Sequence, residues 1–389
     1  MRRFLFLVVA FTLLDGFTAA AKEPANSSSW RHFPGQRSGE FPIAVWLQSP
    51  RRAKEYRAAG INLYIGLWKG PTEEQLDALA QAGMPVVCHQ NEVGLKHIDD
   101  PNIVGWMHGD EPDNAQSRGK GQGYGPPIPP ETVRKQYDTL RRQDPSRPVL
   151  LNLGQGVAWD GWRGRGVRSN HPEDYPQYAR GADYVSFDIY PAAHKSPDVA
   201  GKLWYVAQGV ERLKTWAGAN KPVWCCIECT HINNPQRKAT PHEVEAEVWM
   251  AIIHGAEGLI YFSHQFKPRF IEAGMLADAE MTSAVTRINQ QIQKLAGPLR
   301  TPTINEAISV QVAAGKIPVA TMVKRHDGAM YLFAVNMRGT PAEAMFTLKA
   351  PLEGRNIECL GETRALPLDG RAFRDQFGPW DVRLYRITE

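Results

Sequence analysis

The feature that most constrains this chain is a regular alternation of short apolar runs and amphipathic stretches between residues 41 and 298. Short apolar runs indicate strands that are buried on both faces, and stretches with a period of 3.6 residues indicate helices. Strands are expected at 43–47, 61–67, 84–88, 103–108, 148–152, 183–190, 222–228 and 258–262. Helices are expected at 52–59, 72–82, 131–142, 175–180, 202–217, 241–255 and 278–295.

Eight strands that alternate with helices match a (β/α)8 TIM barrel in number and length. A doubly wound open sheet is the competing fold, but no Gly-x-Gly-x-x-Gly turn follows the first strand. After residue 298 the pattern changes to alternating strands, at 308–312, 329–335, 344–348 and 382–387. We therefore predict a catalytic barrel over residues 41–298 and a small antiparallel β-sandwich over residues 299–389. The sandwich contains no obvious chemical cluster and is expected to pack against the barrel, with sugar binding as the alternative.

The first 21 residues are typical of a secretory signal peptide. Met1-Arg2-Arg3 is basic, residues 4–14 are almost wholly apolar, and small residues at 18–21 precede a polar stretch. The apolar run is too short to cross a bilayer, and no later run suggests a membrane anchor. We expect a secreted or periplasmic protein with a linker over residues 22–40 and no membrane partner.

Charge and motif content exclude several classes of protein. The formal net charge of +4 is too small to indicate a general polyanion binder, so no nucleic-acid partner is expected. Five cysteines are too few for a disulfide scaffold. Cys225, Cys226 and Cys229 do not suggest a metal site, because the first two face opposite sides of a strand. No phosphate loop or serine elbow is present, and no cofactor or metal is expected.

In such barrels the working residues lie at the carboxyl ends of the strands. The polar residues expected there are His89, Asn91, Asp110, Glu111, Asn152, Asp188, Tyr190, Glu228 and His264. Trp46 and Trp159 are further candidates, because aromatic faces stack on sugar rings. The sequence thus predicts a site rich in carboxylates and aromatic rings.

Two strand ends carry the argument for catalysis. The run 103–108 ends at Asp110 and Glu111, and two adjacent carboxylates that are partly desolvated raise each other's pKa. Glu228 shares one side of its strand with Trp224 and Cys226, so alternation predicts that it points into the barrel. The alternative for Glu228 is a buried ion pair with a lysine or arginine. Asp188 is likewise expected to point inward, and its alternative is a hydrogen-bonding anchor for loop backbone.

The barrel resembles the clan A glycoside hydrolases, which place an acid/base glutamate after strand four and a nucleophilic glutamate after strand seven. Four segments carry this resemblance: Gly109-Asp110-Glu111-Pro112, Cys226-Ile227-Glu228, residues 185–191 and residues 255–262. The resemblance implies that Glu111 is the acid/base, Glu228 the nucleophile and Tyr190 its hydrogen-bonding partner. It further implies retaining hydrolysis of a poly- or oligosaccharide by double displacement.

One departure from this clan opens alternatives. Asp110 stands where the clan has an asparagine, and an Asp-Glu pair after strand four also resembles the substrate-assisted N-acetylhexosaminidases. In that mechanism the aspartate orients the substrate's acetamido group, and Glu228 would only bind. A non-catalytic carbohydrate-binding barrel is a third interpretation. Arg163, Arg165 and Arg168 lie among tryptophans in the loop 154–175 and suggest an acidic or sulfated glycan.

Overall fold

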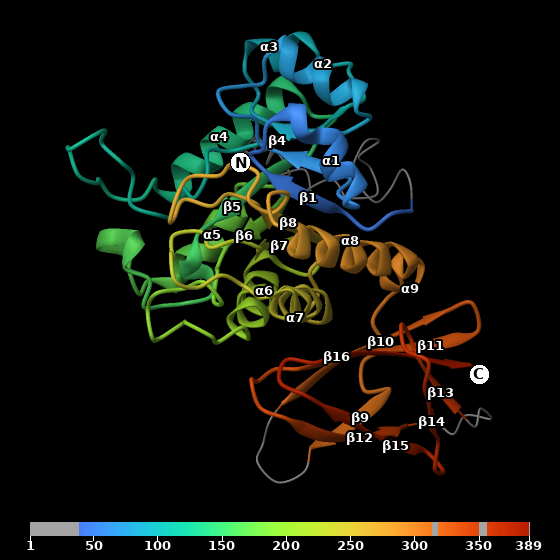
Figure 1. The fold of residues 1–389 in the computed structure, drawn as a ribbon. Helices are drawn as coiled ribbons and strands as arrows, with labels where there is room; N and C mark the ends of the chain where they lie inside the picture. The colour runs from blue at the N-terminus through green and yellow to red at the C-terminus, as the bar shows by residue number, and fades with distance from the viewer. Residues whose placement is uncertain (1–38, 313–317, 350–355, 389) are drawn as a thin grey trace, which may run out of the picture.

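The computed structural model describes residues 39–312, 318–349 and 356–388 (Figure 1). The predicted signal peptide and nearly all of the predicted linker lie outside the described residues. Among the described residues, no helix combines the length and the apolar character that crossing a membrane requires.

Eight parallel strands close into a barrel, as the sequence predicts. The first strand pairs with the last, with Ala44 opposite Ile260, which closes the sheet. The strands are β1 (Ile43–Trp46), β2 (Leu63–Ile65), β3 (Val86–Cys88), β4 (Ile103–Met107), β5 (Val149–Leu153), β6 (Tyr184–Phe187), β7 (Val223–Glu228) and β8 (Gly258–Phe262).

Helices surround this barrel, with short 3-10 turns in the loops. The helices are α1 (Ala53–Ala58), α2 (Glu73–Gln81), α3 (Glu92–Lys96), α4 (Pro130–Gln143), α5 (Tyr175–Ala179), α6 (Tyr205–Ala217), α7 (Pro241–Ile253), α8 (Ala279–Lys294) and α9 (Ala296–Leu299). The 3-10 turns are η2 (Pro50–Arg52), η3 (Gln155–Val157), η4 (Arg163–Arg168) and η5 (Pro172–Asp174). Thr72 and Thr240 begin α2 and α7 with capping boxes. The sequence analysis missed α3, which has only five residues.

Side chains fill the barrel, so the fold contains a packed core rather than a channel. Trp224 and Cys226 of β7 lie in this interior, together with Ile65 and Leu150 of other strands. Ile227, on the opposite side of β7, packs between the barrel and its helices. A ligand can therefore reach the barrel only from its ends.

The C-terminal region forms two antiparallel sheets with an apolar core between them, as predicted. Its strands are β9 (Ile308–Val312), β10 (Val319–His326), β11 (Ala329–Asn336), β12 (Ala342–Leu348), β13 (Asn356–Cys359), β14 (Ala365–Pro367), β15 (Ala372–Phe377) and β16 (Val382–Thr388). One sheet has the order β10-β11-β16-β13-β14 and the other the order β15-β12-β9. The sequence analysis missed β10, β13, β14 and β15.

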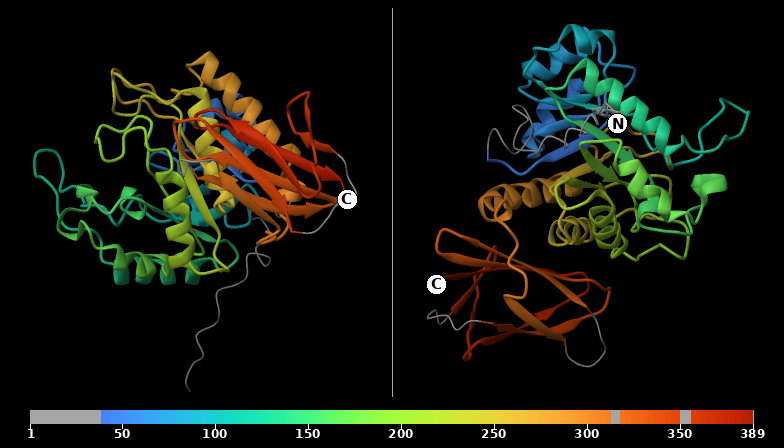
Figure 2. Two further views of the ribbon diagram at one scale, coloured as in Figure 1. Left: turned by 90° about the horizontal axis from the view of Figure 1, so that it is seen from below. Right: turned by 180° about the vertical axis from the view of Figure 1, so that it is seen from behind.

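The two sheets lie on the side of the barrel where α7 and α8 run (Figures 1 and 2). Helix α7 packs against β10, β11 and β16 as well as against β7. The rings of Trp249 and Phe333 stack across this junction, with centroids 5.5 Å apart and planes 14° from parallel. Helix α7 is therefore shared between the barrel and the C-terminal sheets.

Candidate active site

The turn after β4 carries Asp110 and Glu111 in a strained conformation. Glu111 has a φ of 44°, in the left-handed region that non-glycine residues seldom adopt. Its N–H donates to the Asn152 carbonyl at 3.2 Å, and its own carbonyl accepts from the Asn114 N–H at 3.0 Å. Such a conformation costs about 1–3 kcal/mol and persists where the surroundings hold it, often at functional sites.

The carboxyl groups of Glu111 and Asp188 lie close enough to interact, which joins the ends of β4 and β6. We call these two residues the site pair. Burial raises the pKa of Glu111 well above its usual value, and the negative charge of Asp188 raises it further. Burial likewise raises the pKa of Asp188. Two neighbouring carboxyl groups repel each other when both are ionised, so Glu111, whose pKa is raised, is suited to hold a proton and then donate it.

Polar neighbours position both members of the site pair. The Asn114 side chain donates to Glu111 Oε2 at 2.8 Å. The Tyr190 hydroxyl donates to Asp188 Oδ2 at 3.1 Å, so Tyr190 is a partner of Asp188. Its predicted partner was Glu228.

Asp110 is the solvent-accessible carboxylate beside the site pair. Asn152 Nδ2 donates to Asp110 Oδ1 at 2.9 Å, and the Ser186 hydroxyl in turn donates to Asn152 Oδ1 at 2.7 Å. Protein atoms still crowd this carboxylate on most sides, and this partial desolvation raises the pKa of Asp110. Asn152 therefore positions the Asp110 carboxylate, and it influences the site through that carboxylate.

A cavity of about 580 Å³ opens next to Asp110, a size that suits a small ligand. Most of its lining is aromatic or aliphatic, and three of the lining residues are polar. The lining residues are Trp46, Leu47, Trp68, Asp110, Phe262, His264, Phe266, Phe270 and Glu272. The structure thus brings together Asp110, Trp46 and His264 of the predicted binding residues.

Glu228 does not line this cavity. Its side chain is fully buried, and its two carboxylate oxygens accept the N–H groups of Ala192 and Ala193, at 2.6 and 2.7 Å. It also contacts the buried Glu247 of α7. We call Glu228 and Glu247 the wall pair. Burial raises the pKa of both residues.

The placement of Glu228 corrects one expectation from the sequence. Trp224 and Cys226 point into the barrel, but the partners of Glu228 lie on the loop after β6 and on α7. Glu228 is the last residue of β7, so strand alternation no longer determines the direction of its side chain. Its carboxylate instead points toward the N–H groups of Ala192 and Ala193, which donate to it. The alternative of an ion pair is also not met within the described part of the chain, where Glu228 interacts with the side chain of another glutamate, Glu247. Its role as nucleophile stays a prediction.

Other predicted binding residues have structural partners away from the cavity. Asn91 caps α3 by accepting the Gly94 N–H at 2.9 Å, and its amide donates to the Pro71 carbonyl at 2.9 Å. His89 is half-buried and contacts the backbone of His108. Trp159 packs against Trp162 and His194.

The arginines of the loop 154–175 do not support an acidic glycan. Arg165 is buried, donates to Asp174 at 2.7 Å and lies over the ring of Tyr175. Arg168 also donates to Asp174, at 2.6 Å. Both charges are therefore neutralised within the loop.

Sequence reasoning missed two groups of residues. Asp113 is fully buried and holds the loop after β5, because it accepts from the Gly154 N–H at 2.9 Å and the Tyr175 hydroxyl at 3.0 Å. The second group lines the cavity: Trp68, Phe262, Phe266, Phe270 and Glu272. These residues lie shortly after β2 and at or after the end of β8, and this placement at strand ends could have indicated that they belong to the site.

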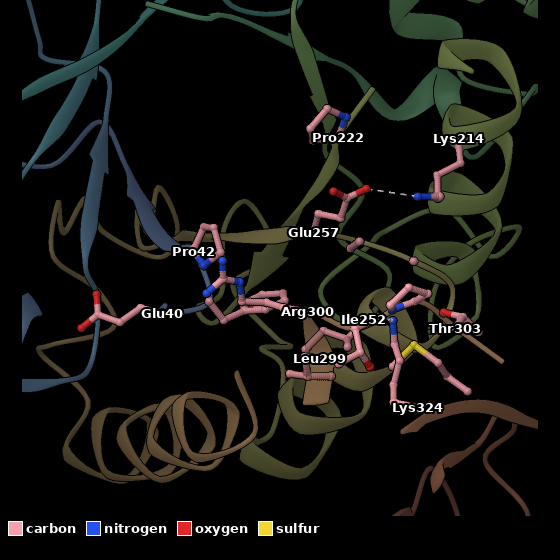
Figure 3. Close-up of a pocket in the computed structure, with 16 residues that line it drawn as sticks. Glu40, Pro42, Lys214, Pro222, Ile252, Glu257, Leu299, Arg300, Thr303 and Lys324 are labelled. Carbon is pink, nitrogen blue, oxygen red and sulfur yellow. Dashed lines mark hydrogen bonds and ion pairs between the residues drawn. The ribbon is translucent and has the colours of Figure 1, made fainter. Parts of the chain in front are cut away.

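A second cavity, of about 410 Å³, lies at the opposite end of the barrel (Figure 3). Pro42, Pro222 and Glu257 line it and stand just before β1, β7 and β8. Lys214 and Glu257 form an ion pair with 3.3 Å between Nζ and Oε1, and Lys324 Nζ donates to the Thr301 carbonyl at 2.6 Å. Figure 3 shows both lysines among the lining residues. This end of a barrel serves stability rather than catalysis.

Comparison with known proteins agrees with this architecture. The sequence model of the family Glyco_hydro_42, described as beta-galactosidase, matches residues 130–300. The match begins at α4, so it includes Asp188 and Glu228 but not Glu111. No curated protein matches the chain.

Solved structures share the fold at low sequence identity. An α-amylase from Geobacillus thermoleovorans has a TM-score of 0.58 at 10% identity, with 90% of this chain and 99% of that chain covered. The catalytic mutant of Gan42B, a GH42 β-galactosidase from G. stearothermophilus, has a TM-score of 0.54 at 8% identity, with 91% and 99% covered. The α-galactosidase I of Mortierella vinacea has a TM-score of 0.55 at 8% identity, with 91% and 98% covered.

The fold and the family match define the class of protein: the chain is a glycoside hydrolase built on a (β/α)8 barrel. The predicted resemblance to the clan A glycosidases is confirmed. Within that class, the family it resembles over residues 130–300 is that of the GH42 β-galactosidases, and its substrate is a carbohydrate.

Proposed function

We propose that this protein hydrolyses β-galactosides with Glu111 as the proton donor. The observation that carries the proposal is the closeness of the Glu111 and Asp188 carboxyl groups to each other and to Asp110, which lines an open cavity. A leaving alkoxide needs a proton at neutral pH, and a carboxyl group with a raised pKa supplies it. The match to the β-galactosidase family supports the choice of sugar.

Double displacement, as the sequence predicts, needs a second carboxylate at the anomeric carbon. Glu228 fills this role only if its carboxylate gives up the N–H groups of Ala192 and Ala193. Retention through Glu111 and Glu228 is therefore the finer form of the proposal. Its substrate would be a poly- or oligosaccharide.

An activity assay with matched variants tests the proposal. Wild type, Glu111→Gln and the surface control Glu280→Gln are assayed on nitrophenyl β-galactoside and on galactose-containing disaccharides. We expect the wild type and Glu280→Gln to cleave a galactoside and Glu111→Gln to lose activity. Equal activity of all three proteins would refute Glu111 as the donor, and inactivity of the wild type on every galactoside would refute the substrate.

Trapping identifies the second carboxylate. An activated 2-deoxy-2-fluoro-galactoside forms a stable ester with the nucleophile of a retaining enzyme, and the labelled peptide names the residue. A label on Glu228 supports the two-glutamate mechanism, and a label elsewhere contradicts it. Azide rescue of Glu228→Gly, with inverted product, provides an independent measurement.

Substrate-assisted hydrolysis of N-acetylhexosaminides is the second candidate. The observation that favours it is that Asp110 faces the cavity while Glu228 is sealed in the wall. In this mechanism Asp110 orients the acetamido group and Glu111 donates the proton. Cleavage of aryl N-acetylglucosaminides but not of galactosides, with strong loss in Asp110→Asn, would select this candidate.

We also propose that the protein is exported, on the basis of the signal-like sequence of residues 1–21. Expression of the full chain in a bacterial host tests this. We expect a shortened mature protein outside the cytoplasm, and an N-terminal sequence that begins near residue 21 or 22.

A further inference from the structure

The outer part of the cavity carries exposed aromatic rings. Trp68 is 68% exposed, Phe270 is 63% exposed and Phe266 is 41% exposed. Large apolar side chains that gather in the open at the mouth of a pocket indicate a binding surface, whereas single exposed ones need no explanation. All three line the same cavity as Asp110.

Exposure also orders the cavity by depth. Trp46 and His264 are buried, whereas Asp110 is solvent-accessible and lies next to the site pair. Phe266, Phe270 and Trp68 are the most exposed aromatic lining residues, so they form the rim. Of the polar groups suited to hydroxyl recognition, His264 therefore lies deep and Asp110 lies next to the site pair, whereas the rim consists of aromatic rings.

A continuous series of ring contacts links this rim to the catalytic groups. Tyr190, which donates to Asp188, lies 5.1 Å from Phe262 between ring centroids. Phe262 lies 5.3 Å from His264, and His264 stacks on Phe266 at 6.0 Å with planes 7° from parallel. These contacts hold Phe266 at a fixed place relative to the site pair, and Phe270 also stacks on His264, with ring centroids 6.3 Å apart.

The rim is poor in partners for sugar hydroxyls. Glu272 is the polar residue that lines the cavity besides Asp110 and His264. A second sugar bound there would leave most of its hydroxyl groups without protein partners, whereas an aromatic or other apolar group would bury the exposed rings.

We propose that the rim formed by Trp68, Phe266 and Phe270 binds an apolar, preferably aromatic, aglycone of a glycoside whose sugar lies beside Asp110. The inference rests on the proposed glycosidase function and names the leaving-group class of its substrate. The sugar enters first, and the aglycone stays at the exposed mouth. Bond cleavage then releases the aglycone directly into solvent.

Comparison of aryl and methyl glycosides tests this site. We expect Phe270→Ala and Trp68→Ala to lower kcat/KM for phenyl β-galactoside about tenfold and for methyl β-galactoside less than about threefold, because a ring contact is lost only with the first. Tyr124→Ala is the matched control, since Tyr124 is 72% exposed and does not line the cavity. Equal losses on both substrates, or none, would overturn the inference.

A binding measurement separates this inference from the proposed function. Calorimetric titration of Glu111→Gln with phenyl and methyl β-galactosides gives an affinity ratio that needs no turnover. A ratio above about ten that falls toward one in the Glu111→Gln/Phe270→Ala double variant supports the rim site. If the wild type cleaves no galactoside, the proposed function fails while this ratio still decides the inference. A ratio near one, or no binding of either compound, overturns it.

Discussion

Two buried carboxyl pairs in this barrel have nearly the same chemistry and opposite surroundings. The site pair, Glu111 and Asp188, lies next to Asp110, which lines an open cavity, and is oriented by side chains. The wall pair, Glu228 and Glu247, is sealed between β7 and α7 and oriented by backbone N–H groups. Burial raises the pKa in both pairs, so a raised pKa alone does not identify a catalytic acid. The two pairs differ in exposure, because Glu111 is only half-buried whereas Glu228 and Glu247 are both fully buried.

The largest expected effect is on the site pair. Glu111→Gln should lower kcat/KM by about 10²- to 10⁴-fold for glycosides with poor leaving groups, because proton donation is lost. The kcat/KM for dinitrophenyl galactoside should decrease much less, because its leaving group departs without a proton. A uniform loss on both substrates, measured by steady-state kinetics, would contradict the role of Glu111 as acid.

Asp188→Asn tests the partner within the same pair. Loss of a charge-assisted hydrogen bond should lower kcat/KM by about 10- to 100-fold. The charge of Asp188 raises the pKa of Glu111, so its removal should lower that pKa, and Glu111 should lose its proton at lower pH. The alkaline limb of the pH profile of kcat/KM should therefore shift to lower pH. An unmoved limb would show that Asp188 does not control the proton of Glu111.

Glu228→Gln probes the wall pair. The amide places a donor against one of the N–H groups of Ala192 and Ala193, so we expect a loss of about 1–3 kcal/mol in the free energy of unfolding. Urea unfolding measures it, with Glu280→Gln as the exposed control. Unchanged stability together with abolished activity would instead place Glu228 in the reaction.

Glu247→Gln should have the smallest effect, which is a change in how the free energy of unfolding depends on pH. Burial raises the folded-state pKa of Glu228 and Glu247 above the unfolded value of about 4.5, so the folded state holds its protons longer. The contribution of these two groups to the stability should therefore be largest below about pH 4.5 and should decrease as the pH rises through their folded-state pKa. Glu247→Gln removes one such group and should flatten this decrease. The same slope in the variant, measured by unfolding at pH 5 and pH 8, would contradict the assignment.

The fold was predictable because each barrel strand is an apolar run followed by a helix, a pattern that depends on local sequence. Asp110 and Glu111 were predictable because a proline follows them directly at a strand end. The direction of the Glu228 side chain was not predictable, because it depends on N–H groups that lie 35 and 36 residues earlier in the chain. The aromatic rim was also not predictable from the sequence, because the loops after β2 and β8 become neighbours only when the barrel closes.

Helix α7 limits how the barrel can be separated from the C-terminal sheets. One side of it packs on β7 and places Glu247, while Trp249 stacks on Phe333 of the C-terminal sheets. A barrel cut free at residue 298 would present that indole and its apolar neighbours to water and would tend to self-associate. Gene shuffling or module grafting that exchanges the C-terminal sheets must therefore preserve an aromatic counterpart for Trp249, or the helix that buries Glu247 loses its support.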